Sequence, residues 1–485
     1  MKLAEIYNQI ETLKIWGNTD KSIQGLAFDS RKVEKDFLFV ATRGTQVDGH
    51  DYVSKAIENG ASSIVCETLP TELNSSVCYI QVKDSQESLG LIAAYWYGNP
   101  SKKLKLVGVT GTNGKTTIAS LLYALFTNLG YSCGLLSTIE NKIDKKAFPA
   151  THTTADALKI NALLAQMLDA GCSYCFMEVS SHALAQKRTA GLHFEGGIFS
   201  NLSHDHLDFH KTVPEYIKAK KLFFDALPKT AFALSNNDDK NGMVMLQNCK
   251  AQKHTYSLKS LASFKGRIIE NQIGGLHMQI DENEIYCRLV GQFNAYNLMA
   301  IYGAAILLGE NKEDVLPALS NLQSVSGRFD YQQTPDGIIV IVDYAHTPDA
   351  LKNVLETINQ LQYSNNKIIT VVGAGGNRDK SKRPEMAKIA AQLSDRLILT
   401  SDNPRFENPE SILADMQEGL NDEQQKRSLS ITKREEAIKT AYFLAQKGDI
   451  VLIAGKGHEN YQEIEGERYH FDDKEVINNL INKNQ

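Results

Sequence analysis

The feature that most constrains the fold is a glycine loop set between an apolar run and a helix. Residues 104–110 are apolar and strand-like, 111–115 read G-T-N-G-K, and a helix is expected over 116–129. The strict G-x-x-x-x-G-K-T pattern fails at one place, because Val109 occupies the first glycine position. The strand before and the helix after still favour a phosphate loop over a chance turn.

Such a loop binds phosphate because small residues let backbone N–H groups approach the oxygens, and the helix amino terminus adds partial positive charge. Lys115 supplies a cation to the terminal phosphates, and the Thr116 hydroxyl can ligate Mg²⁺. The loop therefore predicts an enzyme that uses ATP. The predicted ATP contacts here are Gly111, Thr112, Asn113, Gly114, Lys115, Thr116 and Thr117.

The chain of 485 residues is long enough for several domains. Turn-forming residues at 98–101 and a new strand pattern near 329–331 suggest two boundaries. We therefore expect an α/β protein with domains at 1–97, 98–329 and 330–485: a small α/β domain, a central parallel-sheet domain with the phosphate loop, and a Rossmann-like domain.

Apolar runs alternate with helical stretches throughout, which predicts mainly parallel sheets with helices on both faces. Strands are expected at 37–41, 63–66, 78–82, 104–110, 174–179, 197–201, 337–342, 367–372, 396–400 and 449–453, and helices at 52–59, 116–129 and 156–170. In such sheets ligands bind beyond the carboxyl ends of the strands. Charged and glycine-rich residues stand at those ends in the last domain: Asp343, 373–378, 402–405 and 455–459.

Composition excludes several classes of protein. A formal charge of −5 argues against non-specific nucleic-acid binding. No signal peptide and no apolar run of about 18 residues is present, so we expect no membrane span. Seven irregularly spaced cysteines suggest reduced thiols in a cytoplasm. Cys172 and Cys175 form a C-x-x-C at the start of an apolar run, and we interpret them as buried small hydrophobes rather than a redox or metal pair.

Five further motifs carry a family resemblance. Together with GTNGKTT, the segments MEVSSH (177–182), NLSHDHLDFH (201–210), GQFNAYN (291–297), DYAHTPDAL (343–351) and GKGHE (455–459) stand in one order along nearly the whole chain. In this combination the chain resembles the Mur ligase family, whose members build the peptide of peptidoglycan. It is most similar to the members that join a diamino acid to UDP-N-acetylmuramoyl-L-alanyl-D-glutamate.

The resemblance implies a UDP-binding domain, a central ATPase and a carboxyl-terminal domain for the incoming amino acid. It implies that ATP phosphorylates the substrate carboxylate, that the amine attacks the acyl phosphate, and that phosphate leaves a tetrahedral intermediate. The expected small-molecule partners are ATP, the UDP-sugar dipeptide and the amino acid, with Mg²⁺ as cofactor. We also expect a monomer in a bacterial cytoplasm.

The same resemblance implies roles for four catalytic residues. Lys115 acts on the phosphates, whereas Glu178 and His206 join Thr116 at the metal site. The family carries a carbamylated lysine at the position of Lys220, and the carbamate oxygen would be a metal ligand. From sequence alone the segment YIKAKKLFF would suggest a solvated basic helix face; carbamylation needs a neutral amine, which neighbouring cations favour.

The remaining assignments also follow from the resemblance. Further nucleotide contacts are expected at Asn294, Asn297, Arg328, Asp343 and His346. Contacts to the UDP-sugar peptide are expected at Ser30, Gln46, Thr153, Thr154, Ser180, Gln186 and Arg188. Contacts to the incoming amino acid are expected at Arg378, Asp402, Asn403, Arg405, Gly455 and Glu459, with Glu459 on the distal ammonium.

The segment D-N-P-R (402–405) indicates which amino acid is added. In the family it accompanies meso-diaminopimelate, which carries a second carboxylate that lysine lacks. An arginine fork pairs with a carboxylate bidentately. With lysine bound, Arg405 would be an unpaired buried charge, which typically costs ~3–5 kcal/mol, roughly two to three decades of discrimination.

Three alternatives stay open at this point. The first is the lysine-adding ligase of the same family, and Arg405 argues against it. The second is a folylpolyglutamate synthase, and the long segment before residue 98 and the DYAHTPDAL motif argue against it. The third is a nucleotide-dependent switch, and the presence of Glu178, His206 and Lys220 argues against it. The glycines at 373, 375 and 376 resemble the dinucleotide-binding pattern G-x-G-x-x-G. Its sixth position is Arg378 instead of glycine or alanine, so NAD binding is not expected.

Overall fold

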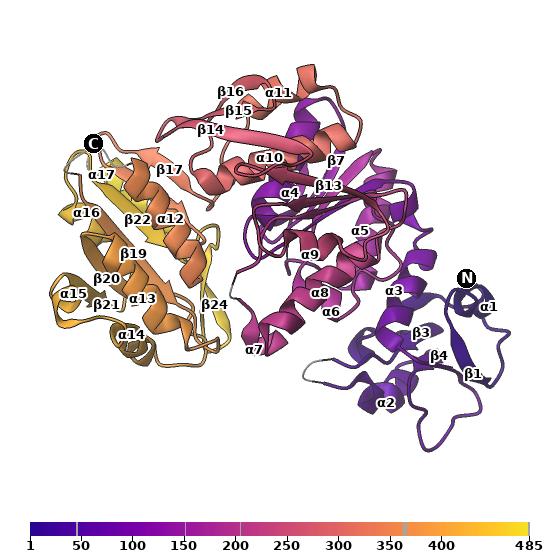
Figure 1. Cartoon of the computed structure of the whole chain (residues 1–485). Helices are drawn as coiled ribbons and strands as arrows, with labels where there is room; N and C mark the ends of the chain where they lie inside the picture. Colours follow the sequence, from indigo (N-terminus) through magenta and orange to yellow (C-terminus); the bar gives the residue numbers. More distant parts are fainter. Residues whose placement is uncertain (45–46, 151, 204, 362–365, 484–485) are drawn as a thin grey trace.

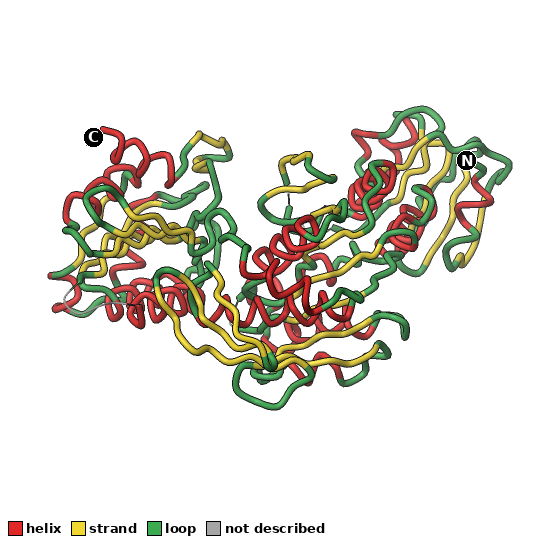
Figure 2. Tube along the Cα trace, turned by 90° about the horizontal axis from the view of Figure 1, so that it is seen from above, coloured by secondary structure: helices red, strands yellow, loops and turns green. Residues whose placement is uncertain are grey.

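The strands form three main sheets that follow one another along an arc, with the two termini at opposite ends (Figures 1 and 2). A computed structural model describes residues 1–44, 47–150, 152–203, 205–361 and 366–483. Within these residues the sheets have five, eleven and six strands, and a separate two-stranded hairpin completes the set. The mixed α/β class expected from the sequence is confirmed.

The first sheet has the order β1-β5-β4-β3-β2 and is parallel except at the β1 edge. α1 and α3 cover one face through Leu3, Leu89 and Ile92, and α2 covers the other through Val53 and Ala56. The elements are α1 (Leu3–Tyr7), β1 (Thr12–Trp16), β2 (Gly25–Ala27), η1 (Ser30–Lys32), β3 (Phe37–Val40), η2 (Gly49–Tyr52), α2 (Val53–Glu58), β4 (Ala61–Cys66), β5 (Cys78–Val82) and α3 (Ser85–Trp96).

The second sheet has the order β16-β15-β14-β13-β12-β11-β6-β10-β7-β8-β9. Its middle is parallel, whereas both edges are antiparallel hairpins. The strands are β6 (Lys105–Thr110), β7 (Cys133–Leu136), β8 (Glu140–Ile143), β9 (Lys146–Pro149), β10 (Tyr174–Glu178), β11 (Gly196–Phe199), β12 (Phe232–Asn236), β13 (Gln252–Ser257), β14 (Phe264–Gln272), β15 (Gly275–Ile280) and β16 (Asn283–Cys287).

Helices cover both faces of this sheet. α4, α10 and α11 pack on one face, and α5, α8 and α9 pack on the other. The helices are η3 (Pro100–Lys102), α4 (Lys115–Asn128), α5 (Ala157–Asp169), α6 (Ser181–Ala185), α7 (Leu207–His210), α8 (Val213–Asp225), α9 (Gly242–Leu246), α10 (Gln292–Leu307) and α11 (Lys312–Ser320). The sheet is buried on both sides, which explains why its central strands are continuous apolar runs.

The third sheet has the order β17-β18-β22-β19-β20-β21, parallel apart from β17. α12, α13 and α14 cover one face, and α16 and α17 cover the other. The elements are β17 (Asp330–Gln333), β18 (Ile339–Asp343), α12 (Pro348–Leu361), β19 (Ile368–Ala374), α13 (Lys382–Leu393), β20 (Arg396–Ser401), α14 (Pro409–Gln417), α15 (Asp422–Lys426), β21 (Ser428–Ile431), α16 (Arg434–Leu444), β22 (Ile450–Ala454), β23 (Tyr461–Ile464), β24 (Glu467–His470) and α17 (Asp473–Lys483).

The strands and helices predicted from apolar runs are all found, most of them within one or two residues of the expected ends. The sequence did not indicate β12 to β16, which extend the central sheet. In β14 and β15 polar and apolar residues alternate, because one face of these two strands is more exposed, whereas β12 is buried throughout. All seven cysteines are free and buried, as expected for Cys172 and Cys175. No helix within the described residues combines the length and apolarity of a bilayer span.

Strand register places the predicted site residues together. Glu178 pairs with Val109, and therefore lies beside the start of the glycine loop. In the third sheet, Asp343 pairs with Ala454, so the ends of β18 and β22 coincide. The carboxyl ends of both parallel sheets thus present the loops that carry the motifs.

Candidate active site

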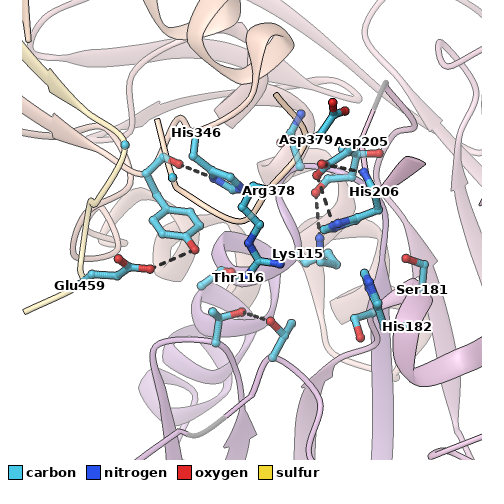
Figure 3. A pocket seen from close by; sticks show the side chains of 18 of the residues that line it. Lys115, Thr116, Ser181, His182, Asp205, His206, His346, Arg378, Asp379 and Glu459 are labelled. Carbon is cyan, nitrogen blue, oxygen red and sulfur yellow. Dashed lines mark hydrogen bonds and ion pairs between the residues drawn. The ribbon is translucent and has the colours of Figure 1, made fainter. Parts of the chain in front are cut away.

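A cavity of about 500 Å³ lies between the central and carboxyl-terminal sheets, and residues from both line it (Figure 3). It brings together most of the predicted site residues. From the central part come Thr112, Asn113, Gly114, Lys115, Thr116, Thr153, Thr154, Glu178, Ser180, Gln186, Arg188, His206 and Lys220, and from the region after it Arg328, His346, Arg378, Asp402, Asn403, Arg405, Gly455 and Glu459.

The glycine loop joins β6 to α4 in the way the sequence predicts. Gly114 has a φ of +86°, and a Cβ there would stand 2.6 Å from Asn297 Oδ1, so glycine is required. The Lys115 ammonium donates hydrogen bonds to the carbonyl oxygens of Gly111 (3.0 Å) and Thr112 (2.8 Å). Burial lowers the pKa of Lys115, against the opposing effect of nearby carboxylates. The loop thus holds its cation on neutral acceptors, which a phosphate can replace.

Glu178 ends β10 and is fully buried. Its Oε2 accepts a hydrogen bond from the Thr116 hydroxyl at 3.0 Å, and its Oε1 accepts one from the Thr138 backbone N–H at 2.7 Å. Arg328 Nη2 lies 3.1 Å from the same Thr116 hydroxyl. A hydroxyl, a buried carboxylate and a guanidinium therefore meet at the start of α4.

Lys220 lies on α8. The sequence alone suggested that it belongs to a solvent-exposed basic helix face, and the structure shows that this interpretation is wrong. The side chain is 1% exposed, and its Nζ donates to Gly111 O at 2.7 Å, the carbonyl that also accepts from Lys115. Burial, and then the neighbouring Lys115 charge, lower the pKa of Lys220 well below its usual value. A buried amine that favours its neutral form is the species that reacts with CO₂.

His206 precedes α7 in the left-handed region, at a φ of 55°. Partial burial lowers its pKa below the usual value, against the opposing effect of Asp205, which favours the neutral imidazole. Asp205 is buried and stands 3.4 Å from His206 Nε2. Its Oδ1 also accepts from the Lys382 ammonium, at 2.6 Å, across the junction between the two sheets.

Asp205 and Lys382 were not identified from the sequence. Asp205 belongs to the quoted NLSHDHLDFH motif, and its position directly before His206 was an available signal. Lys382 begins α13 and gave no such signal, because a lysine at a helix start is ordinarily a surface residue. Only the packing of the two sheets makes it a partner of Asp205.

A second cavity, of about 350 Å³, adjoins the first on the far side of the loop. It is lined by the predicted nucleotide residues Asn113, Gly114, Thr117, Asn297, Arg328, Asp343 and His346. Asn294 and Gly111 line neither cavity. They lie directly behind them, since Asn294 Oδ1 accepts from Asn297 Nδ2 at 3.1 Å and the Gly111 carbonyl holds the two lysines.

Asp343 closes β18 and is wholly buried. Its Oδ2 accepts from the Phe329 N–H at 2.6 Å, and its Oδ1 accepts from the Ala345 N–H at 2.8 Å. Burial raises its pKa to about 6, although the Arg328 charge opposes this. Arg328 in turn stacks on Tyr344, 4.4 Å from the ring centroid. Asp343 therefore fixes the backbone that carries Arg328 and His346.

The second cavity also contains residues that sequence reasoning missed. Asp238 accepts hydrogen bonds from Tyr296 (3.0 Å), Ser257 (2.7 Å) and Ser260 (2.7 Å), and these outweigh burial and lower its pKa to about 2. Tyr296 belongs to the quoted GQFNAYN motif, which was an available signal, whereas no motif marked Asp238 and its neighbours after β12. The missed lining residues include Asn236, Asp238, Asp239 and Tyr296.

The residues predicted to contact the UDP-sugar peptide fall into two groups. Five lie on one wall of the main cavity, where Arg188 donates to the Thr154 carbonyl at 2.7 Å and to Gln186 Oε1 at 2.6 Å. Ser30 lies in the first sheet's unit, buried in η1, and lines neither cavity. Gln46 lies outside the described residues.

The D-N-P-R segment follows β20 and lines the main cavity, together with Arg378. Arg405 has a φ of 53°, its Nη1 donates to Gly376 O at 2.8 Å, and its Nε stands 3.5 Å from Glu463 Oε2. The premise that Arg405 would be unpaired beside lysine is therefore wrong, because Glu463 is a carboxylate partner in the chain itself. The expected discrimination falls accordingly.

Asp402 is also buried among charges. Burial alone would raise its pKa, but Lys456 and Arg434 hold it below its usual value. Arg434 forms a fully buried ion pair with Asp473 at 2.7 Å and donates to the Ala454 carbonyl at 3.0 Å. The floor of this end of the cavity is therefore a network of buried charges.

The chain matches three family models. "Mur ligase family, catalytic domain" matches residues 22–97, "Mur ligase middle domain" matches 109–305, and "Mur ligase, glutamate ligase domain" matches 327–457.

Curated relatives match over the full length. A Bacteroides fragilis protein called UDP-N-acetylmuramoyl-L-alanyl-D-glutamate--2,6-diaminopimelate ligase is 58% identical over 481 residues, which cover 99% of both chains. A Clostridioides difficile protein of the same name is 41% identical and covers 100% of both chains.

Solved structures agree. A structure of a UDP-N-acetylmuramoyl-L-alanyl-D-glutamate--2,6-diaminopimelate ligase superposes with a TM-score of 0.71 at 33% identity, covering 100% of this chain and 99% of that one. A Mycobacterium tuberculosis folylpolyglutamate synthase shares the fold, with a TM-score of 0.61 at 17% identity, over 77% of this chain and 93% of its own. The chain belongs to the Mur ligase family.

Proposed function

We propose that the chain is an ATP-dependent ligase that joins meso-2,6-diaminopimelate to UDP-N-acetylmuramoyl-L-alanyl-D-glutamate, a step in peptidoglycan precursor synthesis. The names of relatives 41–58% identical over the full length support this reaction. ATP as co-substrate is supported by the phosphate loop and by ADP-bound neighbours of the same fold.

One observation carries the proposal. A single cavity is lined by the phosphate loop, by the wall that contains Thr154 and Arg188, and by the D-N-P-R segment. A ligase of this kind must bring three reactants together: a γ-phosphate, a carboxylate and an amine. Loops from two sheets enclose the space, so the reactants can be held away from water that would hydrolyse an acyl phosphate.

The residues fit the two chemical steps. A carboxylate that attacks a γ-phosphate faces like-charge repulsion, which fixed cations relieve. Lys115, on the glycine loop, and Arg328, which contacts the Thr116 hydroxyl, would supply that charge. In the second step the amine attacks the acyl carbon and phosphate leaves. The wall from Asp402 to Arg405 would hold the amino acid for this attack.

We further propose a Mg²⁺ site at the start of α4. Among the described residues, no group of three or more His, Cys, Asp and Glu is arranged to bind a metal without other ligands. Hydroxyl and carboxylate oxygens suit Mg²⁺, which is commonly bound through one or two carboxylates plus substrate phosphates. Thr116, Glu178, His206 and a carbamate on Lys220 would hold it, and the ion would neutralise developing phosphate charge.

The remaining expectations are also proposals. We place the domain boundaries at 97/98 and 329/330, and we propose a cytoplasmic monomer. Nucleotide substrates and free buried cysteines fit a reducing cytoplasm. Ser30 and Gln46 are proposed to contact the uridine end of the substrate, at a distance from the chemistry.

Phosphate release and product mass test the function together. The chain is incubated with ATP, Mg²⁺, the UDP-sugar dipeptide and meso-diaminopimelate, and each substrate is omitted in turn. We expect phosphate and one new UDP-tripeptide only in the complete mixture. Lys115→Met is the inactive control. Turnover of ATP without a requirement for the dipeptide and the amine would contradict the proposal and favour a nucleotide switch.

A further inference from the structure

Lys456 is a buried lysine beside the amino-acid end of the cavity that the roles described above do not use. It follows Gly455 after β22, its side chain is 0% exposed, and it does not line the cavity. A buried ammonium is costly unless it is paired, so its partners indicate its role. Those partners are Asn403 and Glu459, which do line the cavity.

The three side chains form a closed triangle. Lys456 Nζ stands 3.1 Å from Asn403 Oδ1 and 3.2 Å from Glu459 Oε2. Asn403 Nδ2 donates to the same Glu459 Oε2 at 2.8 Å. The remaining oxygen, Glu459 Oε1, has the Tyr344 hydroxyl at 3.4 Å.

This triangle fixes which way the Asn403 amide faces. Its Oδ1 accepts from the Lys456 ammonium and from the Glu463 backbone N–H at 2.9 Å. Both partners can only donate. If the amide were flipped, its NH₂ group, also a donor, would face these two donors and no hydrogen bond could form. Nδ2 carries two hydrogens and donates one to Glu459, which leaves the other for an acceptor in the cavity.

The result is an N–H donor and a carboxylate acceptor side by side on the cavity wall. That pair is complementary to an amino-acid centre, in which a carboxylate and an ammonium share one carbon. Lys456 also helps to hold the pKa of buried Asp402 below its usual value, against the effect of burial. Without its charge, both Asp402 and Glu459 would lose a neighbouring cation.

We propose that Lys456 is a positioning residue for specificity. It holds Asn403 and Glu459 so that they bind the distal amino-acid centre of a diamino diacid, the carboxylate on Asn403 and the ammonium on Glu459. This inference rests on the proposed function, because it concerns the acceptor of that reaction. It distinguishes a diamino diacid from lysine, which has only the ammonium at that end.

The test compares Lys456→Met with wild type in steady-state kinetics for each substrate. Met keeps the length of the side chain and removes the charge. We expect the KM for meso-diaminopimelate to rise on the order of tenfold to a hundredfold. We expect the KM for ATP to stay within about twofold and the preference over L-lysine to shrink. Lys439→Met, a half-buried lysine of α16 that pairs with Glu435 and Glu436, is the control and should leave both constants unchanged.

Several outcomes would overturn the inference. Equal rises in both KM values, or a fall in kcat alone, would indicate a structural role. If circular dichroism shows that Lys456→Met does not fold, Lys456→Gln, which keeps a hydrogen-bond donor, is used for the same test. If neither variant folds, the inference is also overturned. Wild type is measured first: absence of turnover with diaminopimelate would reject the proposed function itself, independently of Lys456.

Discussion

The phosphate-loop region, around residues 111–117, and the amino-acid region, around residues 402–405 and 455–459, surround their basic side chains differently. At the loop, the hydrogen-bond acceptors of the Lys115 and Lys220 side chains are backbone carbonyl oxygens. At the amino-acid end, Lys456 and Arg405 stand beside the carboxylates of Glu459 and Glu463. Among the described residues, the Lys115 ammonium has no carboxylate in hydrogen-bond contact, whereas Lys456 and Arg405 are already beside carboxylates.

The difference follows from the charges of the proposed ligands. A triphosphate and an attacking carboxylate are strongly anionic, so cations on neutral acceptors gain most when these ligands arrive. A diamino diacid is close to neutral overall. A neutralised site with fixed donors and acceptors recognises it through geometry rather than net charge. Substitutions in the first region are therefore expected to change the rate of turnover, and those in the second region the affinity for the amino acid.

The largest effect is expected at Lys220. Lys220→Ala removes the proposed carbamate, and kcat should fall on the order of a thousandfold because a preorganised charged group at the phosphates is lost. A small carboxylate such as formate should partly restore it. Phosphate release is the measurement, and Lys218→Ala, an exposed lysine of the same helix, is the control. A fully active Lys220→Ala enzyme would exclude the carbamate.

A pH effect on stability is expected from Asp343. Its folded pKa of about 6 lies above the usual 3.8, so the folded state binds the proton more tightly than the unfolded state does. Its contribution to stability is therefore present below about pH 4 and is lost as pH rises through 6. The Asp343→Asn variant has no titrating group at this position, so it does not lose this stability as pH rises. The stability advantage of wild type over the variant should shrink by about 2–3 kcal/mol between pH 4 and 7, measured by urea unfolding. A constant difference would contradict the assignment.

The junction between the two regions depends on Lys382. Lys382→Met leaves Asp205 buried beside His206 without its ammonium partner. We expect kcat to fall on the order of 30-fold, because the loop that carries His206 loses a fixed charge. Lys380→Met, a mostly exposed lysine two residues earlier, is the matched control. An unchanged kcat would show that the ion pair does not matter in turnover.

The smallest effect is expected at Arg405. Arg405→Ala should raise the KM for diaminopimelate about tenfold, since a charged hydrogen-bond donor to a carboxylate is lost. The KM for ATP should not change. An equal rise in the KM values for diaminopimelate and ATP would contradict the claim that Arg405 acts only on the amino acid.

The sequence predicted the fold class, the buried strands that precede the motifs and the residues at the ends of those strands, because apolar runs and glycine turns are local signals. It also predicted which side chains meet around the glycine loop, as Glu178 and Lys115 illustrate. It could not predict contacts that depend on how two sheets pack, such as Lys382 on Asp205. Nor did it predict that Arg405 has Glu463 as a partner, because the two residues are far apart in sequence and meet through an isolated bridge between Arg405 and strand β23.

The most direct test of the central claim is the ratio of kcat/KM for meso-diaminopimelate to that for L-lysine, measured on wild type by phosphate release with saturating ATP and UDP-sugar dipeptide. Because Glu463 already pairs with Arg405, we expect a ratio on the order of tenfold to a hundredfold in favour of diaminopimelate. A ratio near one, or a preference for lysine, would contradict the claim that this end of the cavity recognises a second amino-acid centre.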